Sequence, residues 1–317
     1  MMKRLEMAIG MAVGALALIA PAFPKSASAD EIGQGHAIVT VLPKKKSEAP
    51  PNIRIQDLRL KVNGKEATIT NWVRLNKPDD LVELVVLIDS SARSSLGQQL
   101  NDIANFIQGL PANVKVSLGY MDNGRAMLTG PLTTDHAQMA RALHMPAGLP
   151  GSSGGPYFCL SDLAHNWPSR DNMARREVVL ITDGVDIYNL RYDPDDPYVQ
   201  AAITDSAREG MVVYSIYWRS QGMLDNTNYE TNAGQNLLAQ VTQVTGGYSY
   251  WDGLGDPVSF SPYFAQINDA LQNQYRLSFT SPLKDKPQVQ NMNLKVGGPA
   301  AKVYAPQQVK VVPRGME

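Results

Sequence analysis

The chain has 317 residues, of which 44% are hydrophobic and 19% are charged, and this composition excludes a globally disordered protein. Lys and Arg number 29 against 30 Asp and Glu, so the formal net charge is -1 and no basic excess exists for binding nucleic acid through bulk charge. The single cysteine, Cys159, excludes an intrachain disulfide and any metal cage built from several cysteines.

Residues 1–29 have the features of an export signal. Lys3 and Arg4 precede an apolar run from Ala8 to Ala20, and Ala27-Ser28-Ala29 supplies the small-x-small pattern of a signal-peptidase site. The run is shorter than the roughly 20 residues that span a bilayer, and no later stretch of the sequence is long and apolar enough. We therefore expect a mature chain that starts at Asp30, is periplasmic or secreted, and has no transmembrane segment.

Residues 30–79 are expected to form an arm followed by a small β segment. The part up to about residue 52 is polar and broken by prolines, which favours a solvated arm or an edge strand. Alternating segments at 58–62 and 67–73 then flank Asn63-Gly64. Such a pair predicts a hairpin, because both turn residues must accept a positive φ.

Residues 80–275 alternate between predicted strands and helices. Three segments have the pattern of strands buried on both faces: Leu84–Ile88, Glu177–Ile181 and Met211–Tyr217. A short strand is expected at 248–251, a hairpin at Asn123-Gly124, and a long loop in the middle that carries residues 157 and 167. Helices are predicted at about 96–110, 135–144, 198–209, 237–244 and 263–271. Such alternation predicts an α/β fold with a doubly wound, mainly parallel sheet.

Residues 276–317 return to alternating strands separated by proline-rich turns. We expect this C-terminal β segment to pair with the N-terminal one, so that a small β module flanks the α/β domain.

Polar residues follow the predicted core strands at their carboxyl ends. Asp89 ends the first core strand and is followed by Ser90-Ser91, and Asp183 ends the middle strand with Asp186 just beyond. In an open α/β sheet, ligands bind outside the carboxyl ends of the strands, where the strand order reverses. Carboxylate and hydroxyl oxygens suit a hard cation such as Mg²⁺. Asp89, Ser91 and Asp183 are therefore the candidate metal ligands.

Three motifs resemble those of the von Willebrand factor type A (VWA) domain: LVVLIDSS at 84–91, VVLITDG at 178–184, and a helix followed by Thr245-Gly246-Gly247. With the segments at 57–65 and 273–277, the chain is similar to the exported VWA-related proteins of Acidobacteria. The resemblance implies a doubly wound sheet and binding to other proteins through a metal-ion-dependent adhesion site. That site combines an Asp-x-Ser-x-Ser run, a Thr in a second loop and an Asp in a TDG-like turn.

The resemblance assigns Asp89 and Ser91 to the first two positions of that site and Asp183 to the last. Arg93 stands where the second Ser belongs, and Pro156 stands where the Thr is expected. Each departure removes a hydroxyl ligand, and Arg93 brings a cation to where the metal would sit. We expect a degenerate site without a cofactor, a divalent cation remaining the alternative, in which the Arg93 guanidinium turns back and neutralises Asp89 and Asp183.

Side chains on the same edge are candidates for contact with a partner protein. Tyrosine and tryptophan are enriched at binding hot spots because they bury a large area with few rotatable bonds. The hydrophobic core is the alternative location for each ring, above all for the tryptophans at strand ends. The candidate partner-binding residues are Arg93, Tyr157, Asp186, Tyr188, Tyr192, Trp218 and Tyr229.

These features predict an exported, non-enzymatic binding or adhesion module whose partner is another protein. An exported hydrolase is the alternative, because residues 151–155 match the G-x-S-x-G motif, with Ser153 as the nucleophile. That motif needs a preceding strand and a histidine late in the chain, yet prolines precede it and the last histidine, His165, comes before Asp183. A structural envelope component without a discrete ligand is a third hypothesis.

Overall fold

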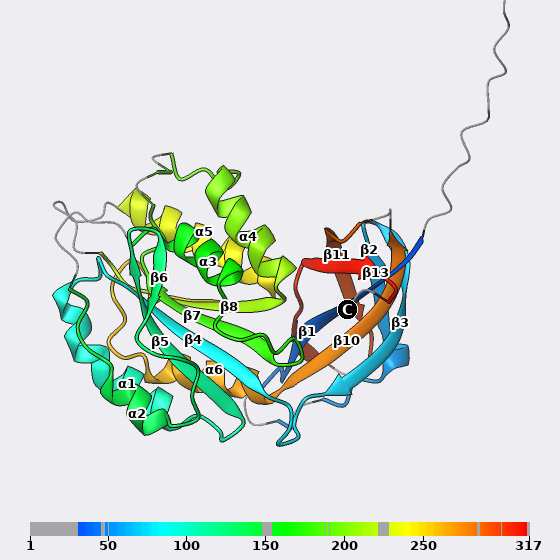
Figure 1. Cartoon of the computed structure of the whole chain (residues 1–317), viewed down its shortest axis with the longest axis horizontal. Helices are drawn as coiled ribbons and strands as arrows, with labels where there is room; N and C mark the ends of the chain where they lie inside the picture. Colours follow the sequence, from blue (N-terminus) through cyan, green and yellow to red (C-terminus); the bar gives the residue numbers. More distant parts are fainter. Residues whose placement is uncertain are drawn as a thin grey trace, which may run out of the picture.

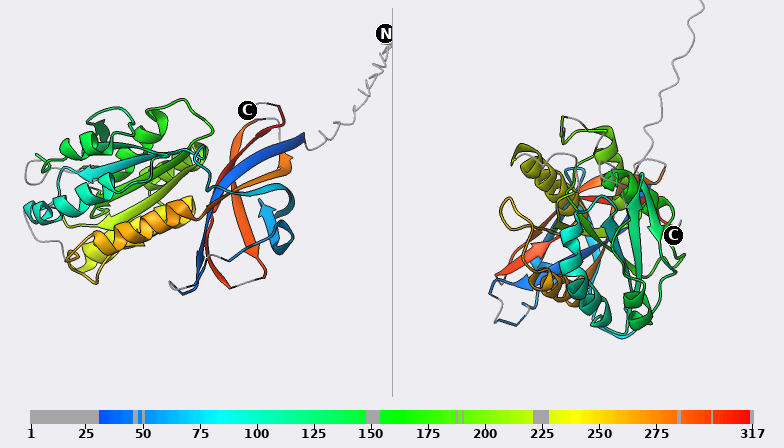
Figure 2. Two further views of the ribbon diagram at one scale, coloured as in Figure 1. Left: turned by 90° about the horizontal axis from the view of Figure 1, so that it is seen from below. Right: turned by 90° about the vertical axis from the view of Figure 1, so that its left-hand side faces the viewer.

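The computed structural model describes residues 31–45, 48–49, 51–147, 154–186, 188–189, 191–220, 228–283, 286–298 and 300–315. The predicted export signal lies outside these residues. The chain forms an α/β unit beside an antiparallel β unit (Figure 1 and Figure 2). Within the described residues, no helix is both long and apolar enough to cross a membrane.

A six-stranded sheet with the order β6-β5-β4-β7-β8-β9 forms the centre of the α/β unit. Its strands are β4 (Val82–Asp89), β5 (Val114–Asp122), β6 (Arg125–Leu128), β7 (Arg175–Thr182), β8 (Met211–Tyr217) and β9 (Ser249–Tyr250). All neighbours pair in parallel except β5 and β6, which form the hairpin predicted at Asn123-Gly124, where φ is 45° and 77°. Every residue of β4, β7 and β8 is buried, as expected for strands covered on both faces.

Helices cover both faces of this sheet (Figure 1). They are α1 (Leu100–Gln108), α2 (His136–Arg141), α3 (Pro156–His165), α4 (Pro197–Arg208), α5 (Asn228–Thr245) and α6 (Ser261–Gln272), and the 3₁₀ turn η2 (Ser94–Gln99) leads into α1. Because alternate side chains of a strand point to opposite faces, β4 contributes to two cores. Leu84 and Val86 pack with α1, α2 and α6, whereas Val85 and Leu87 pack with α3, α4 and α5.

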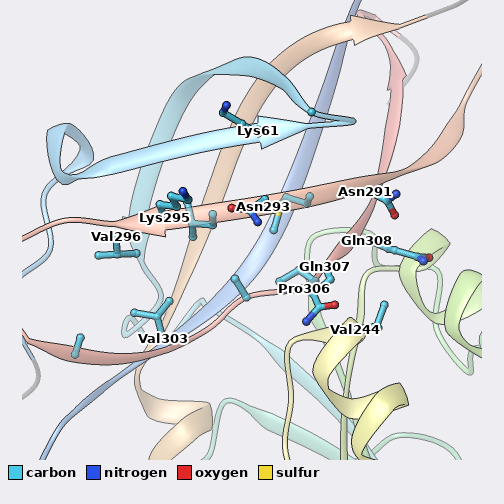
Figure 3. Close-up of a pocket in the computed structure, with 15 residues that line it drawn as sticks. Lys61, Val244, Asn291, Asn293, Lys295, Val296, Val303, Pro306, Gln307 and Gln308 are labelled. Carbon is cyan, nitrogen blue, oxygen red and sulfur yellow. The ribbon is translucent and has the colours of Figure 1, made fainter. Parts of the chain in front are cut away.

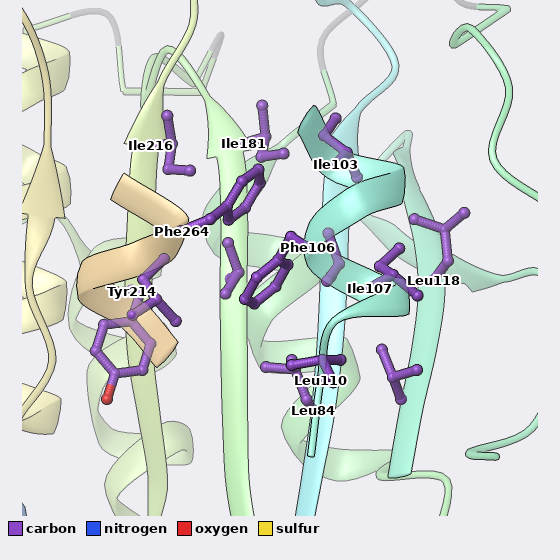
Figure 4. Packing of buried hydrophobic residues seen from close by; sticks show 14 of the residues in the cluster. Leu84, Ile103, Phe106, Ile107, Leu110, Leu118, Ile181, Tyr214, Ile216 and Phe264 are labelled. Atoms are coloured by element: carbon purple, nitrogen blue, oxygen red, sulfur yellow. The ribbon is translucent and has the colours of Figure 1, made fainter. Parts of the chain in front are cut away.

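Figure 4 shows the first of these cores, in which α1 and α6 meet over the sheet. The rings of Phe106 and Phe264 stack with their centroids 4.3 Å apart, beside Ile181 of β7 and Ile216 of β8. Burial of a phenylalanine side chain contributes about 1.5–3 kcal/mol to stability. This packing holds the central strands, and therefore the loops at their carboxyl ends, in fixed positions.

The β unit contains segments from both ends of the chain. Its elements are β1 (Glu31–Pro43), η1 (Ile55–Asp57), β2 (Leu58–Val62), β3 (Lys65–Arg74), β10 (Gln274–Leu283), β11 (Gln288–Val296), β12 (Ala301–Tyr304) and β13 (Gln308–Pro313). The strand order is β10-β3-β2-β11-β13-β1-β12, and β1 also pairs with β10. Six strands therefore close into a barrel, and β12 is attached to β1 outside the ring.

The prediction of an α/β fold with a mainly parallel sheet is confirmed, but three details of the predicted elements are wrong. Residues 31–43 form a long strand inside the barrel rather than a solvated arm or an edge strand. The β unit, with seven strands, is larger than the small module that was expected. The predicted middle loop contains α3, which starts at Pro156 because a proline fits the first turn of a helix.

Candidate functional site

Asp89 and Asp183 lie at the carboxyl ends of two adjacent parallel strands, β4 and β7. From β4 the chain passes through α1 on one face of the sheet to β5, and it reaches β7 after α3 on the other face. The strand order therefore reverses at this edge, which is where open α/β sheets bind ligands. The structure thus brings the two predicted carboxylates to one crevice, which we call the carboxyl-end crevice.

The Asp89 side chain is only 2% exposed and is surrounded by hydrogen-bond donors. Its Oδ1 accepts the Ser91 backbone N–H at 2.8 Å and the Ser91 hydroxyl at 2.6 Å, and its Oδ2 accepts the Thr182 hydroxyl at 2.6 Å. Burial raises the pKa of Asp89, and the hydrogen bonds from Ser91 and Thr182 partly oppose that rise. Both oxygens are thus occupied by donors from within the chain.

Gly154 covers Asp89 from the loop that leads into α3. A Cβ atom at Gly154 would lie 2.4 Å from Asp89 Oδ1, so no larger residue fits there. The Gly154 carbonyl accepts the backbone N–H of Gly124 at 3.1 Å and the thiol of Cys159 at 3.0 Å. Burial raises the pKa of Cys159, so this thiol stays protonated and packs in the core as a small apolar group.

The turn that carries Asp183 is held between α3 and α5. Asp183 Oδ1 accepts the Val185 N–H at 3.0 Å, and the Gly184 carbonyl accepts the Tyr157 hydroxyl at 2.8 Å. Gly184 has a positive φ of 70°, and a Cβ at Gly234 of α5 would lie 2.1 Å from the Asp183 carbonyl oxygen. The position of Asp183 therefore depends on close backbone packing that glycines make possible.

Arg93 connects the loop after β4 to the loop after β8. Its backbone N–H donates to the Arg219 carbonyl and its Nε donates to the Ser220 carbonyl, both at 3.0 Å. The expectation that Arg93 hydrogen-bonds to Asp89 is wrong, because within the described residues Asp89 takes its hydrogen bonds from Ser91 and Thr182. The approach of Arg93 to Asp183 stays a prediction.

Three of the candidate partner-binding residues are buried, so their assignment as contacts for a partner is wrong. Tyr157 is 1% exposed, and Trp218 is 3% exposed with its ring packed edge-on against Phe260. Asp186 is also buried: its Oδ1 accepts the Tyr188 N–H at 3.0 Å, and burial raises its pKa. These side chains shape the edge of the crevice and are not available as contact surface for a partner.

Exposed tyrosines stand on the loops and helix ends around the crevice. Tyr188 is 57% exposed and Tyr229 is 67% exposed, as contact with a partner requires, whereas Tyr192 is half-buried. Tyr198, at the start of α4, is 43% exposed and was not among the candidates. We call Tyr188, Tyr192, Tyr198 and Tyr229 the tyrosine rim.

The rings of the tyrosine rim pack against one another and against Phe158. Centroid distances are 5.2 Å from Phe158 to Tyr188, 4.3 Å from Phe158 to Tyr198 and 5.6 Å from Tyr192 to Tyr229. The Tyr192 hydroxyl also donates to Glu230 at 2.9 Å. The exposed rings are therefore held in place rather than free to rotate.

Several residues that build the crevice, including Thr182 and Gly154, were not singled out from the sequence. Thr182 lies inside the VVLITDG motif, directly before Asp183, and its position at the end of a buried strand is the signal that could have identified it. Trp167, which lies in the segment predicted as a long loop, is far from the crevice: it donates its indole N–H to Glu83 at the other end of β4, at 2.7 Å. Ser153, the candidate nucleophile of the alternative hypothesis, lies outside the described residues.

The described part of the chain contains no cluster of three or more His, Cys, Asp or Glu side chains that could hold a metal ion. The four histidines do not form such a group: His136, for example, contacts the Val114 carbonyl at 2.7 Å, at the start of β5. A metal at the carboxyl-end crevice would need ligands from Asp89, Ser91 and Asp183 together with hydroxyls that positions 93 and 156 do not provide.

No protein-family model and no curated protein matches this chain. Solved structures that it is similar to include an aerotolerance-related membrane protein from Bacteroides fragilis, with 16% identity over 60% of this chain and 98% of that chain and a TM-score of 0.43. The manganese-loaded TRAP protein from Plasmodium vivax is 11% identical over 75% of this chain and 97% of that one, with a TM-score of 0.40. The SpRpn10 VWA domain is 11% identical over 59% and 95%, with a TM-score of 0.38. A VWA domain is thus among the solved structures to which the chain is similar. The motifs at 84–91 and 178–184 lie at the carboxyl ends of two adjacent parallel strands of the α/β unit.

Proposed function

We propose that this chain is an exported, non-enzymatic protein-binding module of the VWA type, and that its partner docks on the tyrosine rim beside the carboxyl-end crevice. The observation that carries the proposal is the exposure of Tyr188 at 57% and Tyr229 at 67% on an edge where α/β sheets bind ligands. Tyrosine is enriched among the residues that contribute most to binding at protein interfaces, where a partner buries its ring. Tyrosines that are exposed at this edge in the free protein therefore favour docking of a partner there.

The packing of the rim supports a prepared binding surface. Phe158 contacts the rings of both Tyr188 and Tyr198, and Tyr192 is held by Glu230 and by the ring of Tyr229. Side chains that are already ordered lose less conformational entropy when a partner covers them. The rim can therefore contribute affinity without a large ordering cost.

The proposal includes a degenerate metal site in the carboxyl-end crevice, beside the tyrosine rim. The residues present there do not fit a directly coordinated divalent cation. The Asp89 oxygens already accept hydrogen bonds from Ser91 and Thr182, and Gly154 packs directly on that carboxylate. Arg93 and Pro156 occupy the positions where hydroxyl ligands would be needed. The buried carboxylate then acts as a structural anchor for the loops after β4 and β7.

A non-enzymatic role is supported by the state of the reactive groups in the described part of the crevice. The Cys159 thiol is buried with a raised pKa, so it is a poor nucleophile. An exported hydrolase would instead depend on Ser153, and ester, peptide or phosphate turnover that is abolished by Ser153→Ala would support that alternative.

Affinity capture with matched variants tests the docking site. The mature chain, the double variant Tyr188→Ala/Tyr229→Ala and the control Tyr248→Ala are immobilised and exposed to an envelope extract. Tyr248 is 44% exposed but precedes β9, at the other end of the sheet. We expect a partner that is retained by the mature chain and by the control and lost from the double variant. Equal retention by all three would place the binding surface elsewhere.

A further inference from the structure

A slot opens in the wall of the β unit between β11 and β12, two strands that follow each other in the chain but do not pair (Figure 3). Over residues 292–296, β11 pairs only with β2 within the described residues, and β12 pairs on one side with β1. The space between the two strands is about 940 Å³ and is bounded by the Val244 end of α5. In the part of the chain that the structure describes, neither of the two strand edges that face this space has a partner strand on that side.

The backbone of β11 directs hydrogen-bonding groups into the slot. The Met292 N–H donates away from β2, to the Gln307 carbonyl at 2.7 Å, whereas the Asn291 carbonyl accepts from Asn63 at the β2 turn at 2.8 Å. Because these directions alternate along an antiparallel strand, the N–H and C=O groups of Leu294 face the slot. One edge of the slot is therefore a template for another strand.

The opposite edge follows the same alternation. The register pairs Thr40 with Tyr304 and Leu42 with Lys302. The Val41 N–H donates to the Asn273 carbonyl, on the β10 side of β1, so the neighbouring residues of β1 face β12. Tyr304 and Lys302 thus bond to β1, and the backbone groups of Val303 face the slot.

The floor of the slot is apolar and belongs to the barrel core. Leu294, Val296, Ala301 and Val303 pack against that core but are only partly buried. Figure 3 shows Val296 and Val303 pointing into the gap from the two strands. Alternate side chains of an inserted strand would complete this core, as alternate residues do in each strand of the barrel.

The outer face around the slot is positively charged. Arg59 of β2 lies directly opposite Lys295 of β11, and like charges in such a cross-strand pair are unfavourable. Lys302 on β12 is exposed as well, and the exposed Lys61 lies 3.5 Å from Glu66. Acidic side chains on the outer face of an inserted strand would relieve this repulsion.

We propose that the slot binds an extended segment of another protein in which apolar and acidic residues alternate, and that this segment completes the barrel wall as an added strand. Since β11 and β12 run antiparallel to each other, the added strand lies parallel to one and antiparallel to the other. Main-chain hydrogen bonds to Leu294 and Val303 hold it, the apolar side chains fill the floor, and the acidic side chains face Lys295 and Arg59. This surface is independent of the tyrosine rim.

Binding of a labelled peptide to the mature chain tests the proposal. The probe is a short peptide in which valine alternates with glutamate, and the comparison peptide has lysine in place of each glutamate. We expect the acidic peptide to bind at least tenfold more tightly by fluorescence anisotropy and to protect the Leu294 and Val303 amides from hydrogen exchange. Failure of both peptides to bind at millimolar concentration, or equal binding of the two, would overturn the proposal.

Two variants identify the slot as the binding site. Val303→Trp fills the floor, whereas the control Thr70→Trp adds the same ring to an exposed position of β3. We expect at least a tenfold loss of affinity in the first and none in the second. The charge reversal Lys61→Glu/Lys295→Glu should invert the preference between the two peptides. A dimer of the mature chain that disappears in Val303→Trp would overturn the proposed occupant in favour of a second copy.

Discussion

The Asp89 side chain anchors the loops of the carboxyl-end crevice through hydrogen bonds from Ser91 and Thr182. A buried ion without donors is strongly unfavourable, so the hydroxyls of Ser91 and Thr182 are needed for the loops to close over it. Because burial raises its pKa in the folded state, the stability that Asp89 contributes is fully present below its unfolded pKa. That contribution is lost as the pH rises through the folded pKa.

Thr182→Val should therefore destabilise the protein in a pH-dependent way. The change leaves Asp89 Oδ2 without its donor, and an unsatisfied buried group costs about 1–3 kcal/mol. We expect this loss in urea unfolding at neutral pH and a smaller one at acidic pH, where Asp89 is protonated. Thr182→Ser keeps the hydroxyl and serves as the control. A loss that is equal at both pH values would contradict this role.

Gly234→Ala tests the close packing behind the Asp183 turn. Its Cβ would lie 2.1 Å from the Asp183 carbonyl oxygen, so α5 and the turn must separate. Overpacking of this kind costs about 1–3 kcal/mol, which a denaturant midpoint detects. Gly97→Ala is the matched control, because its Cβ would meet only Met145 Sδ at 3.5 Å. Similar stabilities for the two variants would show that the turn is not constrained in this way.

At the scale of elements, β1 depends on two glycines that allow close contact with its neighbours. A Cβ at Gly33 would lie 2.6 Å from Val311 Cγ1, and one at Gly35 would lie 2.7 Å from the ring of Phe279. β1 can therefore lie this close to β10 and β13 only because these two positions carry no side chain. These glycines complete the barrel.

Gly35→Val should lower stability although valine is a favourable residue in strands. Intrinsic preference would predict a gain, but the side chain would collide with Phe279 and with the Lys310 carbonyl. We expect a loss of about 1–3 kcal/mol in urea unfolding. The neighbour Gln34→Val, whose side chain points to the other face, controls for strand preference. A Gly35→Val protein as stable as this control would contradict the steric argument.

Elements with a strong local signal could be predicted from the sequence. The strands β4, β7 and β8 are continuous apolar runs because both of their faces are covered, and the Asn-Gly hairpins need a positive φ that few residues accept. The helix α3 was not predicted, because its segment was assigned to a long loop, although the buried residues at 156, 157, 159, 160, 163 and 164 have the spacing of one helix face. The strand β1 was not predicted because Gly33 and Gly35 weaken its alternation.

The candidate site was predictable where it depends on position along a strand and not where it depends on tertiary contact. Asp89 and Asp183 could be placed together because each stands at the carboxyl end of a buried strand, and parallel strands bring these ends to one edge of the sheet. The cover by Gly154 and the burial of Tyr157 depend on where α3 packs, which no local pattern contains. Exposure of individual tyrosines depends on the same packing.

At the scale of the whole molecule, a buried polar network joins the two units. Arg175 at the start of β7 donates to the Gln274 side chain at 2.6 Å, and Gln274 at the start of β10 donates to Glu177 at 2.8 Å. Burial raises the pKa of Glu177 from 4.5 to about 7, and the nearby Arg175 opposes that rise. The side-chain amide of Gln274 also donates to the Tyr214 hydroxyl, at 3.5 Å. The joint between the units therefore contains a carboxyl group that titrates near neutral pH.

Glu177→Gln should flatten the pH dependence of stability. With a folded pKa above the unfolded one, the contribution of Glu177 is complete below about pH 4.5 and is lost as the pH rises to about 7. A shift of this size corresponds to roughly 3 kcal/mol. We expect urea unfolding between pH 5 and pH 8 to show a smaller loss in Glu177→Gln than in the wild type. Glu66→Gln, at a position where the side chain is 68% exposed, is the control. Parallel pH profiles for Glu177→Gln and the wild type would contradict this account.

Thermal unfolding of the mature chain with and without millimolar Mg²⁺ or Mn²⁺ tests most directly whether the carboxyl-end crevice works without a metal. A ligand at 100 times its dissociation constant adds about 2.7 kcal/mol to stability, which a melt detects easily. Because the Asp89 oxygens already hold internal donors and Arg93 and Pro156 supply no hydroxyl, we predict a midpoint that the metal leaves nearly unchanged. A clear metal-dependent rise in the wild type that disappears in Asp183→Ala would contradict the account and show a working metal site.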